Sequence, residues 1–455
     1  MTDVAALLRD ALGERVDTSE AALEAARADK SGHRTAGRPL AVVHAASVSD
    51  VQTTMRIATA TATPVVTRGA GTGLAGGANT GPGEIALSVR GMNRVIEVRP
   101  DDLLAVVEPG ILNADLGRAL APHGLWWAPD PASREISTVG GNIATGAGGL
   151  LCAKYGVVRD AVLALDVVLA DGRLISTGHR SVKGVTGYDL TALMIGSEGT
   201  LGIVVGATLK LRRLVPGETR TLTAQFPDVR TAAAGAAAVT ASGAQPAIME
   251  LMDAVSLAAA HALLGLPSPT PGATQLTVQT DGVAAAEEQA AIADILTSIG
   301  GAVRLAADDV EAAQLWAVRR AMHPAMESLG TALIEDVSVP RSALPAMFDE
   351  IARIEAEFDV TIPTVCHAGD GNLHPNFVFH GEEVPDRVWQ AADALFRAAV
   401  ALGGTLTGEH GIGVLKSRWL ADELGEDQWS LQRGIKSVFD PTGILNPGKV
   451  FASQP

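Results

Sequence analysis

The stretch RGAGTGLAGGANTGPG, Arg68 to Gly83, decides which fold the first half of the chain can form. It contains the spacing GxGxxG at Gly71, Gly73 and Gly76, which also occurs in Rossmann dinucleotide-binding domains. A Rossmann fingerprint opens a helix, however, and no helix can begin in the run GANTGPG that follows here. Glycine lacks a Cβ, so the backbone N–H groups of such a loop can approach a phosphate closely. The sequence therefore predicts a phosphate-binding loop outside a Rossmann fold, with an ordinary turn-rich loop as the alternative.

Two further glycine-rich stretches follow in the same part of the chain. STVGGNIATGAGG, residues 137 to 149, offers Thr138, Asn142 and Thr145 as hydrogen-bonding side chains, and GSEGTLGIV spans residues 196 to 204. Both are predicted to be loops. Three such loops suit a long ligand with several polar segments better than a mononucleotide.

The order of elements around these loops indicates two different domains. Residues from about 50 to 61 are predicted to form a helix, and VVT, IALSV and VIEV are predicted strands. A change of composition in RRLVPGETRT, residues 212 to 221, predicts a domain boundary. Beyond it, alanine-rich helices alternate with strands such as QLTVQT and TIPTVCHA, which predicts an α+β domain with a substantial sheet.

Composition and charge exclude several classes of function. A chain of 455 residues suggests two or three domains, and a net charge of -16 argues against binding to nucleic acid or to an anionic membrane face. No apolar run approaches the roughly 20 residues that span a bilayer, and the N-terminus does not resemble a signal peptide. We expect a cytoplasmic protein, which a partner could hold peripherally at a membrane. Cys152 and Cys366 lie too far apart to predict an iron–sulfur cluster or a disulfide framework.

The motif CHAGDGNLHPNF, residues 366 to 377, places two histidines around an Asp-Gly turn signal. With Asp370 and Gly371 at the centre of a type I′ turn, His367 would pair directly with His374. Their Cβ atoms would lie about 4.5 to 5.5 Å apart on one face of the hairpin, and Asn376 would share that face. Two imidazoles at that distance can bind one cation, although a solvated cross-strand pair of histidines is the alternative.

The segment GEHGIG, residues 408 to 413, can supply what the hairpin lacks. Glu409 would be a third ligand, and two histidines with one glutamate and an open position form a recognised catalytic zinc arrangement. Side chains of adjacent residues diverge in an extended segment, so His410 is not expected to bind the same ion. The surrounding glycines allow a bend that aims His410 beside the metal, which suits a general base.

The glycine loops carry a family resemblance. PVVTRGAGTGLAGG, PDPASREISTVGGNIATGAGG, TGYDL and GSEGTLGIV resemble the FAD-binding domain of the vanillyl-alcohol oxidase and p-cresol methylhydroxylase superfamily over residues 40 to 214. The resemblance implies that FAD is held non-covalently, since the first two loops contain no histidine or cysteine that could tether it. The implied FAD contacts are Arg68, Gly69, Gly71, Thr72, Gly73, Leu74, Gly76, Gly77, Pro129, Asp130, Ser137, Thr138, Gly141, Asn142, Gly148, Gly149, Glu198, Gly199, Ile203 and Asn446.

The second half of the chain is similar to the FAD-linked oxidases that include D-lactate dehydrogenase, the catalytic subunit of glycolate oxidase and D-2-hydroxyglutarate dehydrogenase. CHAGDGNLHPNF, GEHGIGVLK and FDPTGILNPGKVF carry this likeness. It implies three ligands of a divalent metal, with zinc as the expected ion: His367, His374 and Glu409. It also implies His410 as catalytic base, Asn376 as a contact of the substrate or the metal site, and Arg319 in LWAVRRAM as the residue that binds the substrate carboxylate. Apart from the resemblance, Arg319 fits a solvated helix arginine beside Arg320.

These resemblances imply an α+β architecture and a reaction. An FAD-binding domain of the p-cresol methylhydroxylase type, with two subdomains, would cover residues 1–215. A substrate and metal domain with an antiparallel sheet would cover 216–420, and residues 421–455 would return to the FAD domain. The implied reaction oxidises a small 2-hydroxy acid by hydride transfer to FAD. Relatives that act on 2-hydroxyglutarate have a lysine before a DxSxP stretch, where this chain has Ile334 and Glu335, which favours D-lactate, glycolate or a larger monocarboxylic acid.

Several alternatives stay open at the level of sequence. They are a D-2-hydroxyglutarate dehydrogenase, an oxygen-using oxidase, a flavin-binding subunit of a larger complex, and a zinc hydrolase without flavin. A dehydrogenase with no cluster of its own would pass electrons to a quinone, a cytochrome or a partner protein. The stereochemistry of the substrate and the oligomeric state, with a homodimer among the options, stay open as well.

Overall fold

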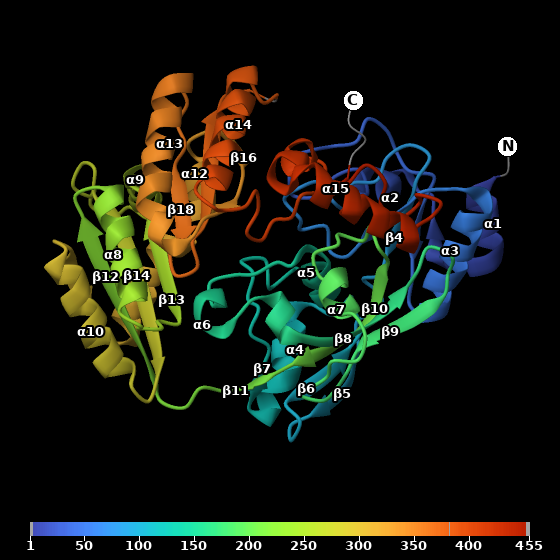
Figure 1. The fold of residues 1–455 in the computed structure, drawn as a ribbon, viewed down its shortest axis with the longest axis horizontal. Coiled ribbons are helices and arrows are strands. Elements are labelled where there is room, and N and C mark those ends of the chain that lie inside the picture. Colours follow the sequence, from blue (N-terminus) through green and yellow to red (C-terminus); the bar gives the residue numbers. More distant parts are fainter. Residues whose placement is uncertain (1–2, 382, 452–455) are drawn as a thin grey trace. The chain divides into compact units, whose positions relative to one another are not determined.

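The computed structural model describes residues 3–381 and 383–451, and the chain divides into two compact units. Unit 1 comprises residues 1–148, 156–214 and 409–455, and unit 2 comprises residues 149–155 and 215–408. The boundary between residues 214 and 215 lies within the change of composition at residues 212 to 221. The chain re-enters unit 1 at Glu409, before residue 421. Mixed helices and strands, with an antiparallel sheet in unit 2, confirm the expected α+β class (Figure 1).

Unit 1 contains two main sheets and a short β7–β11 pair. Strands β2, β4 and β3 run parallel, with β1 antiparallel at the edge, whereas the five-stranded sheet has the antiparallel order β5-β6-β10-β8-β9. The strands are β1 Val16–Asp17, β2 Ala41–His44, β3 Val65–Arg68, β4 Ile85–Ser88, β5 Val95–Arg99, β6 Leu104–Val107, β7 Leu125–Trp126, β8 Val162–Val168, β9 Leu174–Gly178, β10 Ile203–Lys210 and β11 Arg212–Arg213.

The helices of unit 1 cover these sheets and close two hydrophobic cores. Residues of α1 and α3 pack on the parallel sheet, and residues of α4 and α5 pack on the antiparallel one. Ser47 begins α3, because its Oγ accepts the N–H of Asp50 at 3.2 Å. The helices are α1 Val4–Leu12, α2 Glu20–Ala25, α3 Val48–Thr61, α4 Asn113–Leu120, α5 Val139–Thr145, α7 Leu190–Met194 and α15 Leu420–Phe439, with 3-10 turns η1 Gly13–Arg15, η2 Ala121–His123, η3 Val158–Ala161 and η5 Ser417–Trp419.

The C-terminal segment is tied into the parallel sheet of unit 1. The N–H of Val65 donates to Ile444 O at 2.7 Å, and the N–H of Asn446 donates to Val65 O at 2.8 Å. These two bonds extend β3 with a short parallel bridge to Leu445. The last part of the chain is therefore built into the same unit as the first glycine loop, which begins where β3 ends.

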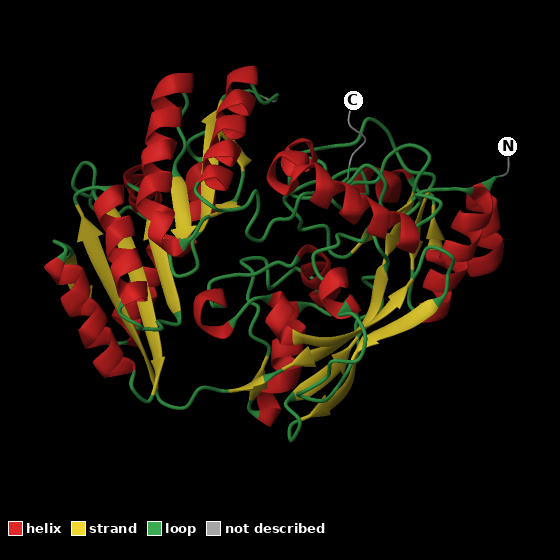
Figure 2. Ribbon diagram, viewed as in Figure 1, coloured by secondary structure: helices red, strands yellow, loops and turns green. Residues whose placement is uncertain are grey.

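Unit 2 is built on one eight-stranded antiparallel sheet (Figure 2). Its strand order is β15-β12-β14-β13-β18-β19-β16, and β17 also pairs with β19. The strands are β12 Glu218–Phe226, β13 Ile248–Met252, β14 Thr274–Gly282, β15 Ala302–Leu305, β16 Thr331–Ile334, β17 Val337–Ser338, β18 Thr364–His367 and β19 Asn372–Phe379.

Two groups of helices pack on this sheet. Helices α8, α10, α13 and α14 contact one another and the strands, and α9, α11 and α12 form a second group around a core that includes Met252 and Val365. The helices are α6 Cys152–Tyr155, α8 Val229–Ala241, α9 Ala254–Leu263, α10 Ala285–Ser298, α11 Asp309–Arg320, α12 Met322–Glu327, α13 Leu344–Phe358 and α14 Asp386–Ala401, with the 3-10 turn η4 Arg341–Ala343.

Two local predictions were wrong. The second glycine stretch is not a continuous loop, because α5 begins inside it after Thr138. The β18–β19 hairpin does not use a two-residue turn at Asp370 and Gly371, because His367 pairs with Asn372 and four residues connect the strands. His374 pairs with Val365 instead of with His367. This register differs from the predicted one by two residues, so the side chains keep the faces that were predicted for them.

No helix in the described ranges 3–381 and 383–451 combines the length and the apolar character needed to cross a bilayer.

Candidate functional site

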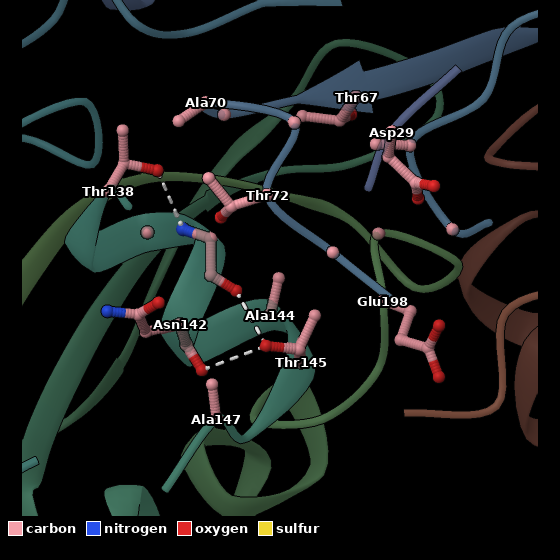
Figure 3. Close-up of a pocket in the computed structure, with 18 of the residues that line it drawn as sticks. Asp29, Thr67, Ala70, Thr72, Thr138, Asn142, Ala144, Thr145, Ala147 and Glu198 are labelled. Carbon is pink, nitrogen blue, oxygen red and sulfur yellow. Dashed lines mark hydrogen bonds between the residues drawn. The ribbon is translucent and has the colours of Figure 1, made fainter. Parts of the chain in front are cut away.

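Unit 1 contains a pocket that all three glycine stretches line (Figure 3). Thr67 of β3, residues of α5 and the segment around Glu198 face it. The cavity holds about 240 Å³. Its lining residues are Asp29, Thr67, Gly69, Ala70, Gly71, Thr72, Gly73, Leu74, Ala75, Gly77, Ala78, Val89, Pro109, Pro131, Ala132, Ser133, Thr138, Gly140, Gly141, Asn142, Ala144, Thr145, Ala147, Ser197, Glu198, Gly199, Gly202, Ile203, Val204, Glu409 and His410.

Arg68 holds the first loop through hydrogen bonds to the backbone. Its guanidinium donates to Ala28 O at 2.6 Å and to Ala78 O at 2.9 Å, and burial lowers the pKa of this group from its ordinary value. Arg68 therefore stabilises the loop instead of facing the pocket. At Gly69 the loop passes so close to α5 that a Cβ there would lie 2.4 Å from Thr138 Oγ1, so no larger residue fits without a shift.

The second stretch enters the pocket as the start of α5. Thr138 caps this helix, since its Oγ1 accepts the N–H of Gly141 at 3.2 Å. Thr145 Oγ1 donates to Gly141 O at 3.1 Å and lies 3.5 Å from Asn142 O (Figure 3). The hydroxyl groups of Thr138 and Thr145, which were predicted to bind a ligand, thus also form hydrogen bonds with the backbone of α5.

The third stretch joins the pocket to the GEHGIG segment. Glu198 is buried and accepts the N–H of Ile412 at 2.7 Å and that of Gly413 at 2.8 Å. Asn446 Nδ2 donates to Glu198 O at 2.6 Å and to Gly77 O at 3.1 Å, which links the third loop with the first. Glu409 and His410, which precede this anchored segment, are half-buried and line the pocket.

Most of the residues expected to contact FAD line this pocket. Those that do are Gly69, Gly71, Thr72, Gly73, Leu74, Gly77, Thr138, Gly141, Asn142, Glu198, Gly199 and Ile203. Those outside its lining are Arg68, Gly76, Pro129, Asp130, Ser137, Gly148, Gly149 and Asn446. Of these, Gly149 belongs to unit 2. The sequence motifs did not single out Asp29 or Pro109, which reach the pocket from other parts of the chain.

The pocket fits a large polar cofactor such as FAD. Thr67 Oγ1, Asn142 Nδ2 and Asp29 Oδ2 are buried polar atoms without a hydrogen-bond partner among the described residues. Buried polar groups are normally satisfied, so these atoms are available for a ligand. Close approach of backbone at the glycine loops, together with these polar atoms, matches a ligand with phosphate, sugar and ring segments.

Burial raises the pKa of Glu198 to about 7 from 4.5, and the N–H groups of Ile412 and Gly413 oppose the shift. Between these pH values the folded protein holds a proton that the unfolded chain releases, so the free energy of unfolding falls as pH rises through the window. Glu198→Gln abolishes this titration. In FAD-free protein, the melting temperature of the variant should therefore fall less between about pH 5 and about pH 7.5 than that of the parent. An equal fall in both proteins, measured by thermal unfolding, would contradict this origin of the pH dependence.

Unit 2 presents a row of polar side chains across three neighbouring strands. Glu250 of β13 pairs with His367 of β18, and His367 pairs with Asn372 of β19. His374 lies two residues along β19 on the same face, and its ring centroid is 4.8 Å from that of His367 with the planes at 84°. The two predicted metal-binding histidines therefore come together, although through a diagonal relation across the strands and not as a direct pair.

Arg319 reaches the same row from the last turn of α11. Its Nε donates to Glu250 Oε2 at 2.8 Å, and its Nη2 forms an ion pair with the same oxygen at 2.7 Å. Glu250 Oε1 lies 2.7 Å from His367 Nδ1. Burial by itself would raise the pKa of Glu250, but His367 and Arg319 outweigh it and hold the pKa below its ordinary value. Arg319 is thus no solvated surface arginine, since its side chain is only 16% exposed.

Asn376 lies on β19 beyond His374, and its amide is engaged with the backbone. Nδ2 donates to His374 O at 2.8 Å and to Pro363 O at 3.1 Å. The sequence did not single out Glu250 or Asn372. The signal for Glu250 is a carboxylate in the middle of the apolar strand IMELM, where a buried charge requires partners.

Comparisons with known proteins agree with this organisation. Residues 39–178 match the FAD binding domain, and residues 215–450 match the family described as FAD linked oxidases, C-terminal domain. The chain is 38% identical over 422 residues to the glycolate oxidase subunit GlcD of Bacillus subtilis (strain 168), with 91% of this chain and 90% of that protein covered. It is 34% identical over 431 residues to a D-lactate dehydrogenase of Anaerostipes hadrus, with 91% and 90% covered.

A solved structure shares the fold over nearly the whole chain. p-Cresol methylhydroxylase with substrate bound aligns with a TM-score of 0.78 at 18% identity, covering 99% of this chain and 96% of that one. This likeness confirms the expected fold class, and the family match confirms an FAD-binding domain.

Proposed function

Because the chain belongs to the family of FAD-linked oxidases, we propose that it oxidises a 2-hydroxy acid to the 2-oxo acid, with FAD as the hydride acceptor. One observation carries this proposal. The pocket formed by the three glycine stretches is also lined by Glu409 and His410, so the flavin site and the candidate acid–base residue belong to one cavity. The names of the relatives, glycolate oxidase subunit and D-lactate dehydrogenase, point to the same substrate class.

The glycine stretches are proposed to hold FAD without a covalent bond, through Thr67, Asn142 and the backbone of the first loop. Bound FAD would supply the acceptor for a hydride from C2 of the substrate, and a bound divalent cation would supply the charge that polarises the 2-hydroxyl group. The residues of the chain bind the carboxylate, hold the cation and move the proton.

Arg319 is proposed to bind the substrate carboxylate. A guanidinium has five N–H donors, and Glu250 accepts the one at Nε and forms an ion pair with Nη2. The Nη1 group and the second Nη2 hydrogen form another edge of the fork. That edge matches the two oxygens of a carboxylate.

His367 and His374 are proposed to bind the cation, which we expect to be zinc. Their ligating nitrogens lie within 4.8 Å of one another, a distance that one ion can bridge. Glu409 is the proposed third ligand. Gly408, which precedes it, donates its N–H to Asp336 Oδ2 at 2.7 Å and lies so close to Asn372 that a Cβ would be 2.4 Å from Cγ.

His410 is proposed to remove the proton of the 2-hydroxyl group. Histidine suits this step because its imidazole changes charge near neutral pH. Glu198 orients the segment that carries His410, since it accepts the N–H groups two and three residues further along. Asn376 is proposed to contact the substrate or the metal site through Oδ1.

The residue opposite Asn376 favours a monocarboxylic substrate. Ile334 of β16 pairs directly with Asn376, so an apolar side chain lies on the strand face that carries His374. The side chain at this position carries no positive charge that could bind a second carboxylate of the substrate. Ile334→Lys is expected to raise kcat/KM for D-2-hydroxyglutarate relative to D-lactate by about 10-fold or more, the scale of one charge-assisted hydrogen bond. Ile334→Met is the matched control without charge, and an unchanged ratio in the lysine variant would contradict this placement of Ile334.

Electrons are proposed to leave the reduced flavin for a separate acceptor, a quinone, a cytochrome or a partner protein. The glycolate oxidase relative is named as a subunit, which supports a partner in electron transfer.

The test of the reaction is anaerobic mixing of the FAD-loaded protein with glycolate and with both enantiomers of lactate and of 2-hydroxyglutarate. Bleaching of the flavin absorption band by a monocarboxylic acid supports the proposal, and an oxidised flavin with every one of these acids contradicts it. Reoxidation by oxygen alone at the turnover rate would identify an oxidase instead.

A further inference from the structure

We propose that Glu250 is a positioning residue, which fixes the substrate-binding arginine and a metal-binding histidine with the two oxygens of one carboxylate. This inference rests on the proposed function for the roles of Arg319 and His367. It assigns a role to a residue of β13 that would contact neither the substrate nor the metal.

The position of Glu250 in the sheet allows it to reach both partners. It is directly opposite His367 in the β13–β18 register, with the two strands side by side in Figure 1. Its side chain is 1% exposed, so the carboxylate is shielded from water. Oε2 accepts the Nε hydrogen of Arg319 and forms an ion pair with its Nη2, and Oε1 lies 2.7 Å from His367 Nδ1. Each oxygen therefore serves one partner.

The contact with Arg319 selects which edge of the guanidinium faces a ligand. Long arginine side chains lose considerable rotamer freedom when they are fixed, and Glu250 fixes this one before any substrate binds. Because Nε and Nη2 both face Glu250, the Nη1 side of the guanidinium is the edge that can bind a carboxylate. Substrate binding then does not have to order the side chain, which favours a low KM.

The contact with His367 selects which ring nitrogen can bind a metal. A carboxylate beside Nδ1 keeps the proton on that nitrogen, so the lone pair is on Nε2. Metal-binding histidines commonly donate their other N–H to a carboxylate, which orients the ring and makes it a stronger ligand. Glu250 is thus expected to raise metal affinity without being a ligand.

A glutamine at position 250 separates positioning from mere packing. Glutamine has the same shape but only one acceptor oxygen, so it can accept a hydrogen bond from Arg319 or from His367 Nδ1 but not from both. For Glu250→Gln we expect Zn²⁺ affinity to fall by about 10- to 100-fold, the usual effect of losing such a partner. The readout is competition between FAD-loaded protein and a chromophoric chelator, with no substrate present. Affinity for pyruvate, followed in metal-free protein by the flavin difference spectrum, should fall as well.

Asp253 provides a matched control in the same part of unit 2. Its two oxygens likewise accept two N–H groups, from Ser256 at 2.7 Å and Thr364 at 2.6 Å, but neither partner belongs to the proposed site. Asp253→Asn should lower thermal stability while Zn²⁺ and pyruvate affinities stay at parental values. If Glu250→Gln also lowers stability alone, with both affinities unchanged, Glu250 is only structural and the inference is overturned.

A second variant covers the case in which Glu250→Gln does not fold because Arg319 is left buried without its counter-charge. Glu250→Gln combined with Arg319→Gln removes both charges. Compared with Arg319→Gln alone, the double variant should still bind Zn²⁺ about 10-fold or more weakly, because His367 has lost its charged acceptor. Equal Zn²⁺ affinities in these two variants overturn the inference. A parent protein that binds no Zn²⁺ at all overturns the metal part of the proposed function, and this is measured before any variant is made.

Discussion

Replacing His410 with alanine is expected to slow flavin reduction by the best 2-hydroxy acid by about 10²- to 10⁴-fold, the usual contribution of a general base. His410 lines the flavin pocket, and it follows the proposed metal ligand Glu409 in the chain. The variant therefore lacks the imidazole that is proposed to accept the hydroxyl proton. The variant should still bind FAD, because the glycine stretches that form most of the pocket are unchanged.

The measurement is the rate of flavin bleaching after anaerobic mixing, with FAD content determined in the same sample. His123→Ala is the matched control, since His123 is an exposed histidine of unit 1 outside the pocket lining. It should reduce flavin at the parental rate. A His410→Ala variant that also bleaches at the parental rate would remove His410 from the role of base.

His374→Ala is expected to weaken Zn²⁺ binding by more than about 100-fold. Loss of a residue that only hydrogen-bonds a metal ligand costs up to roughly 100-fold, whereas this change removes a ligand itself. Flavin reduction should fall with it, since no cation is left to polarise the hydroxyl group. Added Zn²⁺ should restore the chelated parent but not the variant. FAD binding should be unaffected, because His374 belongs to unit 2 and the flavin pocket to unit 1.

His380→Ala is the control for this change. His380 follows directly after β19, the strand that carries His374, but it is exposed to solvent. Metal content measured on both purified variants decides the question. A His374→Ala protein that retains one tightly bound Zn²⁺ per chain would show that the metal has other ligands.

The β18–β19 hairpin shows why the face of a strand is easier to predict than its register. The Asp-Gly signal suggested a two-residue turn, but the strands are joined by four residues, with Gly371 in the left-handed region at a φ of 86°. The error shifted the pairing by two, and side chains alternate with a period of two. His367, His374 and Asn376 therefore stayed on one face although His367 faces Asn372.

Contacts between distant parts of the chain could not be predicted from the sequence. Glu250 and Arg319 are 69 residues apart and come from a strand and a helix, so no local pattern joins them. Asp29 reaches the pocket from a segment with no motif. The glycine stretches were recognisable because close backbone approach restricts the residue type locally, whereas a buried ion pair depends on the packing of α11 against the sheet.

The central claim is that one chain removes hydride from a metal-bound 2-hydroxy acid and delivers it to FAD. A single-turnover experiment under anaerobic conditions tests it most directly, with the 2-oxo acid and reduced flavin measured in the same mixture. The account predicts one equivalent of 2-oxo acid per flavin reduced, loss of both signals after chelation, and recovery of both when Zn²⁺ is added back. Flavin that stays oxidised with every 2-hydroxy acid in the Zn²⁺-loaded protein, or that is reduced at the same rate after chelation, would contradict it.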